Sequence, residues 1–188
     1  MDLTNFIDQG FSHILDLEGY DHILFIFSFS CIYPLKEWKK LVGLITLFTL
    51  THTAALLLAA KQLVTVNYDL IELLIVLTIL ASALYNIFVF KPDNRKYHWA
   101  PFVIIPSFGI IHGLGFSNFF RMITDLDNDI LTPFAGFVIG LELGQLIILT
   151  ISLSLSIIIL KINQSIHQYW RFIVSGIVGA FAIYLLLT

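Results

Sequence analysis

The sequence predicts an all-α integral membrane protein, a bundle of six transmembrane helices with a short N-terminal amphipathic helix at the membrane interface. Three observations predict this class. Of the 188 residues, 58% are hydrophobic and only 12% are charged, whereas a soluble domain carries about 25% charged residues. The mean hydropathy is +0.90. Apolar runs recur at lengths close to the ~20 residues that a helix needs to cross the hydrocarbon core. We expect a single membrane domain over residues 1–188.

The composition also excludes several classes of protein. A single cysteine, Cys31, rules out a disulfide scaffold. A net charge of −3 provides no basic field for nucleic acid, so we expect no nucleic-acid partner. The length of the apolar runs favours helices over barrel strands, which would be about 10 residues of alternating polarity.

The N-terminal segment, residues 1–18, differs from the rest of the chain. Apolar side chains recur in it at helical spacing: Leu3, Phe6, Ile7, Phe11, Ile14 and Leu15. This spacing predicts a short amphipathic helix over residues 3–17 that lies on the outer surface of the membrane. His13 falls near its polar side.

Six apolar runs follow and are the expected membrane spans. They cover about residues 19–35, 41–60, 70–90, 100–120, 131–155 and 170–187. The first run is short for a span and the fifth is long. Glycines four residues apart on the fourth and fifth spans predict close helix packing: Gly109, Gly113, Gly136, Gly140 and Gly144. Such packing favours a tight monomer and is also compatible with a small homo-oligomer.

Basic residues predict the orientation of these spans. Eight lie in loops on one side and two on the other: Lys36, Lys39, Lys40, Lys91, Arg95, Lys96, Lys161 and Arg171 against Lys61 and Arg121. The side with eight is cytoplasmic by the positive-inside rule. After six crossings, both termini are therefore expected outside, in the periplasm if the membrane is a bacterial inner membrane. Acidic residues gather on the external side, where they would concentrate cations.

Ionisable side chains inside membrane spans are costly and usually functional. His22, His52, His112 and Glu142 fall on four different expected spans. At 1.5 Å per residue, His52 and His112 lie about 12 Å below the outer surface, Glu142 about 15 Å and His22 about 5 Å. All four are therefore expected in the outer half of one bundle. Imidazole and carboxylate groups are ligands for divalent transition metals and are also the groups of proton relays.

Structural alternatives stay open for these residues. His52 and His112 could form hydrogen bonds between helices, and Asp21 could cap the helix that begins there. Soft-metal chemistry is disfavoured because sulfur ligands are scarce in the chain. Three further ionisable residues are expected outside the site, in solvent or in loops: Glu72, His98 and His167.

Four segments, in order and each on its own span, resemble the HupE/UreJ family, and its shorter branch most closely: GYDHILF at 19–25, FTLTHT at 48–53, FGIIHGLGF at 108–116 and GLELGQ at 140–145. The resemblance runs from about residue 10 to residue 145. It implies a permease of about six helices that supplies nickel for hydrogenase or urease. Phe108 and Gly115 stand where nickel permeases of the family carry a His and a Glu.

The resemblance also implies a set of metal-handling residues: Asp21, His22, His52, His112 and Glu142. We add His13 to these candidate ligands. The function that we expect is a secondary permease or channel for nickel, cobalt or zinc, with the metal ion and the lipid bilayer as partners. One alternative is a zinc-dependent intramembrane hydrolase with Glu142 as general base. Another is a b-haem electron carrier with His52 and His112 as axial ligands.

Overall fold

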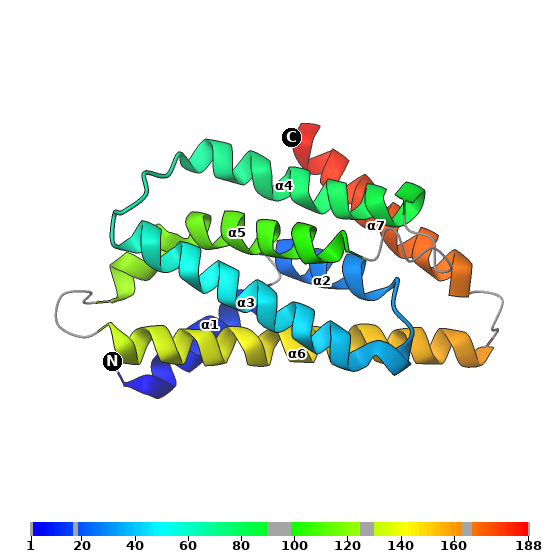
Figure 1. Ribbon diagram of the computed structural model, residues 1–188, viewed down its shortest axis with the longest axis horizontal. Helices are drawn as coiled ribbons and strands as arrows, with labels where there is room; N and C mark the ends of the chain where they lie inside the picture. Colours follow the sequence, from blue (N-terminus) through cyan, green and yellow to red (C-terminus); the bar gives the residue numbers. More distant parts are fainter. Residues whose placement is uncertain (1, 17–18, 90–98, 125–129, 163–166, 188) are drawn as a thin grey trace.

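The computed structural model describes residues 2–16, 19–89, 99–124, 130–162 and 167–187 (Figure 1). Over these residues the chain is helical and has no strand, as predicted. Two short segments flank the longer helices: the 3-10 helix η1 (Leu35–Glu37) and the π-helix η2 (Tyr85–Val89). The α-helices are α1 (Leu3–Leu15), α2 (Asp21–Ser30), α3 (Trp38–Ala60), α4 (Tyr68–Leu84), α5 (Pro101–Ile123), α6 (Leu131–Ile162) and α7 (His167–Leu187).

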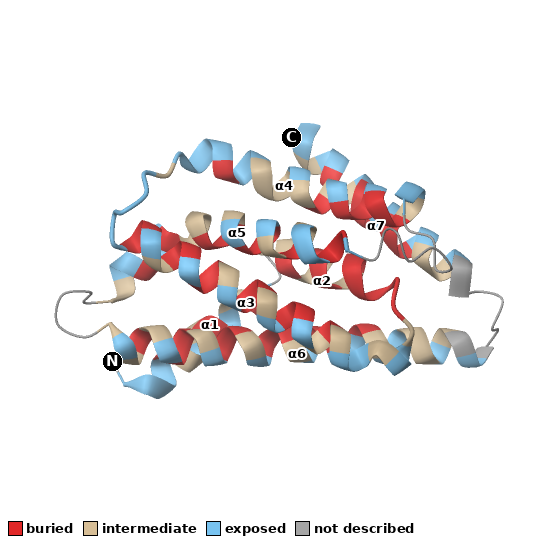
Figure 2. Cartoon of the chain, in the orientation of Figure 1, coloured by how far each residue is buried: buried red, intermediate tan, exposed pale blue. Residues whose placement is uncertain are grey.

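The expected count of six membrane-spanning helices is not confirmed. The expected first span, residues 19–35, contains only the ten-residue helix α2. Ten residues cover about 15 Å, half of the ~30 Å hydrocarbon core. Helix α2 is nevertheless apolar and largely buried, and it lies in the middle of the bundle (Figure 2). Within the described part of the chain, five segments are long and apolar enough to cross a membrane: Leu35–Ala60, Tyr68–Val89, Pro101–Ile123, Leu131–Ile159 and Tyr169–Leu187.

Helices α1 and α2 run one after the other through the bundle. In Figure 1, α1 begins beside the N-terminus at the left end, and α2 leads to the right end, where α3 begins. Particular residues mark the start of α1 and the end of α2. Asp2 caps α1 by accepting a hydrogen bond from the backbone N–H of Asn5. Pro34, in an extended conformation, separates α2 from η1.

Helix α1 packs along α6, and the expected interfacial helix over residues 3–17 is not confirmed. The buried residues of α1 are one turn apart, at Phe6, Gly10 and Ile14. The glycines of α6 face this stripe. A Cβ atom at Gly140 would lie against the carbonyl oxygen of Ile7, so the two backbones are in contact. The apolar stripe of α1 therefore faces another helix rather than lipid.

A second pair of glycines brings α5 against α3. A Cβ atom at Gly113 would lie against the carbonyl oxygen of His52, and one at Gly109 would be close to the carbonyl oxygen of Phe48. Small residues permit this approach where lipid provides no hydrophobic force between helices. As a result, His112, the neighbour of Gly113, lies at the same level of the bundle as His52.

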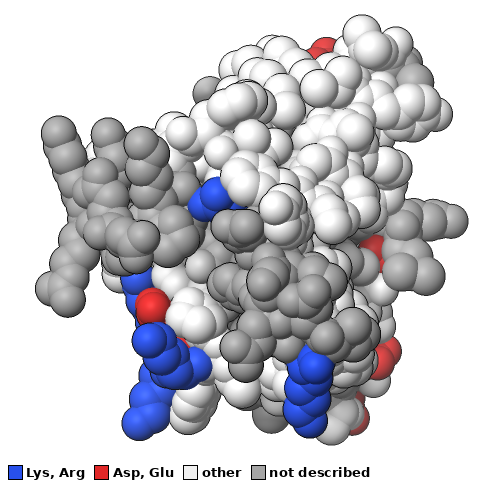
Figure 3. All heavy atoms as spheres, turned by 90° about the vertical axis from the view of Figure 1, so that its right-hand side faces the viewer, with Lys and Arg blue, Asp and Glu red and all other residues white. Residues whose placement is uncertain are grey.

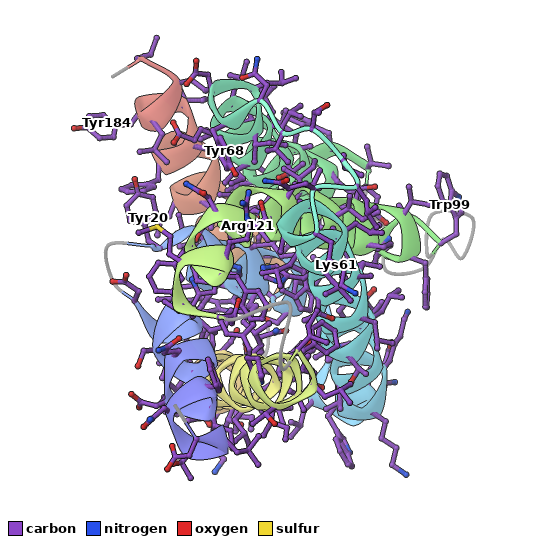
Figure 4. All side chains as sticks on the ribbon, turned by 90° about the vertical axis from the view of Figure 1, so that its left-hand side faces the viewer. Tyr20, Lys61, Tyr68, Trp99, Arg121 and Tyr184 are labelled. Carbon is purple, nitrogen blue, oxygen red and sulfur yellow. The ribbon has the colours of Figure 1, made fainter. Side chains whose placement is uncertain are left out.

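Basic side chains separate towards the two ends of the bundle. Figure 3, which views the right-hand end of Figure 1, shows Lys and Arg side chains at several separate places on that end. Lys39 and Lys40 lie in the first turn of α3, and Lys161 lies in the last turn of α6. Lys61 and Arg121 lie at the opposite end (Figure 4). Three of the basic residues from which the orientation was predicted lie outside the described residues: Lys91, Arg95 and Lys96. The side of the membrane on which each end lies stays a prediction.

We expect Gly140→Ala to destabilise the bundle, because the added methyl group would overlap the backbone of α1 at Ile7. Overpacking of this kind costs about 1–3 kcal/mol, and thermal unfolding in detergent would show a lower Tm. The matched control is Gly176→Ala on α7, where an added Cβ meets no atom within 4 Å. Equal losses of Tm in the two variants would contradict tight packing of α1 on α6.

Candidate metal centre

Four histidines and one aspartate, from four helices, meet near the middle of the bundle. His13 lies in the last turn of α1, and Asp21 and His22 open α2. His52 comes from α3 and His112 from α5. The ring centroid of His22 lies 4.9 Å from that of His13, 5.9 Å from that of His52 and 4.8 Å from that of His112. His22 is therefore the centre of the cluster.

The cluster contains two overlapping groups of potential metal ligands. One group is His13, His22 and His52, and the other is Asp21, His22 and His112. Within each group, one ligand atom from each residue lies within 4.8 Å of the other two. Two ligands bound to one ion at about 2.1 Å lie no more than about 4.2 Å apart. Small side-chain movements would therefore bring either group around a single ion.

Asp21 links the two histidines of the second group. Its Oδ1 atom lies 3.0 Å from Nδ1 of His22 and accepts a 2.9 Å hydrogen bond from the His22 backbone N–H. Its Oδ2 atom lies 2.9 Å from Nε2 of His112. The side chain of Asp21 is 22% exposed, whereas those of His22 and His112 are 3% and 2% exposed. The carboxylate is thus the most accessible part of its group.

The backbone sets the tautomer of His112. Its Nδ1 atom lies 3.0 Å from the carbonyl oxygen of Phe108. A carbonyl oxygen only accepts, so Nδ1 carries the hydrogen, and Nε2 of the neutral ring presents a lone pair. This lone pair faces the carboxylate of Asp21, with which it forms no hydrogen bond of good geometry. Two electron-rich atoms at 2.9 Å require a cation between or beside them, either a proton or a metal ion.

Among the described residues, Nε2 of His13 and His22 and both ring nitrogens of His52 are buried and have no hydrogen-bond partner. Nε2 of His112 is also buried, and its only printed contact is the Asp21 carboxylate at 2.9 Å. A buried polar atom without a partner costs about 1–3 kcal/mol, and native proteins contain few of them. Their concentration at one place indicates that the cluster is built to bind something that the chain itself does not supply.

Aromatic side chains surround the cluster. The ring of Phe108 lies 3.7 Å from that of His112, and the ring of Phe116 lies 3.7 Å from that of His13, between centroids. Phe48 contacts His22 and His52 at 5.7 and 5.5 Å. An apolar shell of this kind fixes the orientation of the ligands and limits the access of water.

Glu142, the remaining candidate ligand, belongs to neither group. Its carboxylate accepts hydrogen bonds from Thr46 at 2.7 Å and from Thr49 at 2.5 Å, both on α3. Depth along α6 led the sequence analysis to group it with the histidines. The structure brings together the other five candidates, His13 included, and places Glu142 beside the two threonines.

Sequence reasoning missed two residues of α4 that lie beside the cluster. Tyr68 and Glu72 line a cavity of about 210 Å³ together with His13, Asp21, His22 and His112. Glu72 also lines a neighbouring cavity of about 620 Å³, with Asp21 and Asp69. The three-residue spacing of Asp69 and Glu72 on one helix face was the available signal. These acids form an approach to Asp21.

Comparison with known proteins identifies the family of the chain. A family model described as HupE / UreJ protein matches residues 1–188, the whole chain. The chain belongs to the HupE/UreJ family. The match confirms the resemblance carried by the Asp-His, Thr-His and His-Gly segments, and the family is associated with membranes. No curated protein and no solved structure matches the chain.

We expect His22→Ala to weaken metal binding more than any other single change, because His22 belongs to both ligand groups. The Kd for Ni²⁺ should rise about 100-fold or more, equivalent to about 2.8 kcal/mol. His13→Ala leaves the second group intact, so its affinity for Ni²⁺ should fall less than that of His22→Ala. Equilibrium dialysis of the purified protein with Ni²⁺, Co²⁺ and Zn²⁺ measures these affinities.

The control for this series removes two other histidines, His98 and His167, whose side chains lie outside the described residues. Both are predicted from the sequence to lie in loops away from the site, so the double alanine variant should bind metal as the wild type does. Unchanged binding in His22→Ala, or equal losses in the control, would contradict the cluster as the binding site.

Proposed function

We propose that this chain is a permease or channel for a divalent transition-metal cation, which binds at the histidine cluster. One observation carries the proposal: among the described residues, buried histidine nitrogens from three helices converge without hydrogen-bond partners, beside the His112–Asp21 pair, in a bundle of membrane-spanning character. Ionisable residues inside a membrane bundle are expensive and mark ion pathways. The family, which is associated with nickel or cobalt accessory or transport roles, supports the same class of function.

The position of the cluster favours transport over structural metal binding. It lies where α1 ends and α2 begins, and interrupted helices commonly form the ion sites of transporters. Asp69 and Glu72 would attract a cation, and Asp21, the accessible ligand, would receive it. We propose that this route opens to the periplasm of a bacterial inner membrane, with both termini on that side.

The ligand set suits nickel, cobalt or zinc. It consists of imidazole and carboxylate groups, which suit borderline divalent ions. Cys31, the only cysteine, donates a hydrogen bond from Sγ to the carbonyl oxygen of Ser28 at 3.1 Å and is in neither ligand group. The family association then favours nickel or cobalt as the cargo.

The two alternative functions receive less support. A zinc hydrolase with Glu142 as general base needs that carboxylate at the metal, but its described hydrogen bonds go to threonines. The described cavity that is lined by residues of both ligand groups has a volume of about 210 Å³, below the ~300–1,000 Å³ of pockets for larger ligands. The wider cavities beside it, about 620 Å³ at Asp21 and about 800 Å³ at His13, are each lined by only one of the ligand groups.

Uptake by proteoliposomes that contain a metal-sensitive dye tests the proposal. We expect nickel or cobalt uptake by the wild type, and a loss of at least tenfold in His52→Ala and His112→Ala, because each variant removes a ligand from one group. The double variant at His98 and His167 serves as control. Circular dichroism and gel filtration establish that each variant is folded.

Normal uptake by both cluster variants would overturn the proposal. Hydrolytic turnover that chelators abolish would favour the hydrolase, and a Soret band in the purified wild type would favour the haem protein. In the absence of uptake, the first finding would indicate that the cluster serves hydrolysis, and the second that it binds haem, rather than transporting a metal.

A further inference from the structure

The carboxylate of Glu142 has polar surroundings of its own at the edge of the bundle, where Glu142 is half-buried, Thr46 is exposed and Thr49 is buried. Each carboxylate oxygen accepts a hydrogen bond from one hydroxyl of α3: Oε1 from Thr46 at 2.7 Å and Oε2 from Thr49 at 2.5 Å. Thr49 in turn accepts a 3.0 Å hydrogen bond from Nε2 of Gln145. Gln145 is fully buried, and its Oε1 atom has no partner. Among the described residues, Oε1 of Gln145 is therefore a hydrogen-bond acceptor without a donor, next to the network around the carboxylate.

Both threonine hydroxyls have an alternative acceptor within their own helix. The Thr46 hydroxyl lies 3.2 Å from the carbonyl oxygen of Val42, and the Thr49 hydroxyl lies 3.2 Å from that of Ile45. A hydroxyl has one hydrogen to donate and can accept two hydrogen bonds. Each hydrogen can thus point either to Glu142 or to the backbone, with no movement of the helix.

This arrangement satisfies Glu142 in two protonation states. When the carboxylate is ionised, both threonines donate to it. When it is protonated, its O–H donates to one threonine oxygen, and that threonine turns its own hydrogen to the backbone carbonyl. A lysine or arginine partner would hold the ionised state alone. Because the two threonine hydroxyls can rotate, Glu142 can bind and release a proton while its carboxylate oxygens and both hydroxyls keep a hydrogen-bond partner.

Charged groups face this site from several helices, and some of them belong to the histidine cluster. No described Lys or Arg forms an ion pair with Glu142. Thr49 precedes His52 by three residues, about one turn of α3. The titratable residues on the helices packed against α6, other than tyrosines, are Asp8 and His13 of α1, Asp21 and His22 of α2, Lys39, Lys40 and His52 of α3, and His167 and Arg171 of α7.

We propose that Glu142, with Thr46, Thr49 and Gln145, forms a proton-binding site that releases its proton when a metal ion occupies the histidine cluster. The coupling rests on the proposed function, whereas the proton site does not. Thr49, which donates to Glu142, lies one turn of α3 from His52, and a dication at the histidine cluster favours the ionised carboxylate by electrostatic attraction. When the ion leaves, the proton returns. The coupled ion of the transport cycle would then be a proton.

Labelling with dicyclohexylcarbodiimide, which reacts with protonated carboxyl groups in apolar surroundings, tests the site in the purified full chain. Mass spectrometry should find the adduct on Glu142 at acid pH, less of it at alkaline pH, and less again when Ni²⁺ is added. In Thr46→Val/Thr49→Val the ionised form loses both donors, so the midpoint of labelling should move up by about one pH unit or more. Glu142→Gln should lose the adduct.

The matched control is Thr150→Val, also on α6. Its hydroxyl donates to the carbonyl oxygen of Leu146 at 2.7 Å on an exposed face, away from Glu142. We expect its labelling midpoint to equal that of the wild type. Infrared difference spectra between acid and alkaline pH give a second readout, a protonated-carboxyl band that Glu142→Gln should abolish. If neither the adduct nor the band changes with pH in the folded wild type, the proton site is wrong.

Proton release tests the coupling separately. In weak buffer with a pH indicator, Ni²⁺ should release about one proton more from the wild type than from Glu142→Gln, because metal binding displaces protons. Equal release by the two proteins would overturn the coupling. If the wild type binds no Ni²⁺, Co²⁺ or Zn²⁺, the proposed function fails and the coupling with it. The pH dependence of the adduct and the band would then still decide the proton site.

Discussion

Direct contact between helix backbones at glycines holds the metal centre together. Gly113 allows α5 to reach the carbonyl oxygen of His52, and the neighbouring His112 therefore lies inside the same cluster. Gly140 allows α1 to lie along α6, which brings the last turn of α1 to the start of α2. Lipid supplies no hydrophobic force between helices, so association depends on such close packing. Any side chain at these glycines would separate helices that carry ligands.

Hydropathy was sufficient to predict the long helices, because an apolar run of that length has few structural solutions in lipid. Hydropathy was insufficient for residues 1–35. Residues 19–35 have the composition of a span, but Pro34 and the segment before Asp21 leave only ten of them in α2. The stripe of α1 has the same period whether it faces lipid or α6. Only the contacts of Gly140 distinguish the two.

Depth along a helix predicted that His52 and His112 share a level, and the structure brings both into one cluster. The position of a residue along a helix does not specify which side of the helix its side chain faces. Glu142 was grouped with the histidines for its depth, yet it faces the threonines of α3. Glu72 was expected in solvent and is exposed, and it also lines the cavity beside the cluster. The side that Glu142 faces and the place of Glu72 in the cavity wall both depend on packing between helices.

His22 belongs to both groups of ligands, and its Nδ1 atom already lies on Asp21. Its remaining nitrogen can bind one ion at a time, so in the proposed transport the two groups would be successive positions of one ion rather than independent sites. An ion that shifts between them would exchange its other ligands while the bond to His22 persists. It would keep a ligand throughout in a medium of low dielectric constant, where an isolated charge is most costly. A shared histidine would thus lower the activation barrier for passage and limit occupancy to one ion.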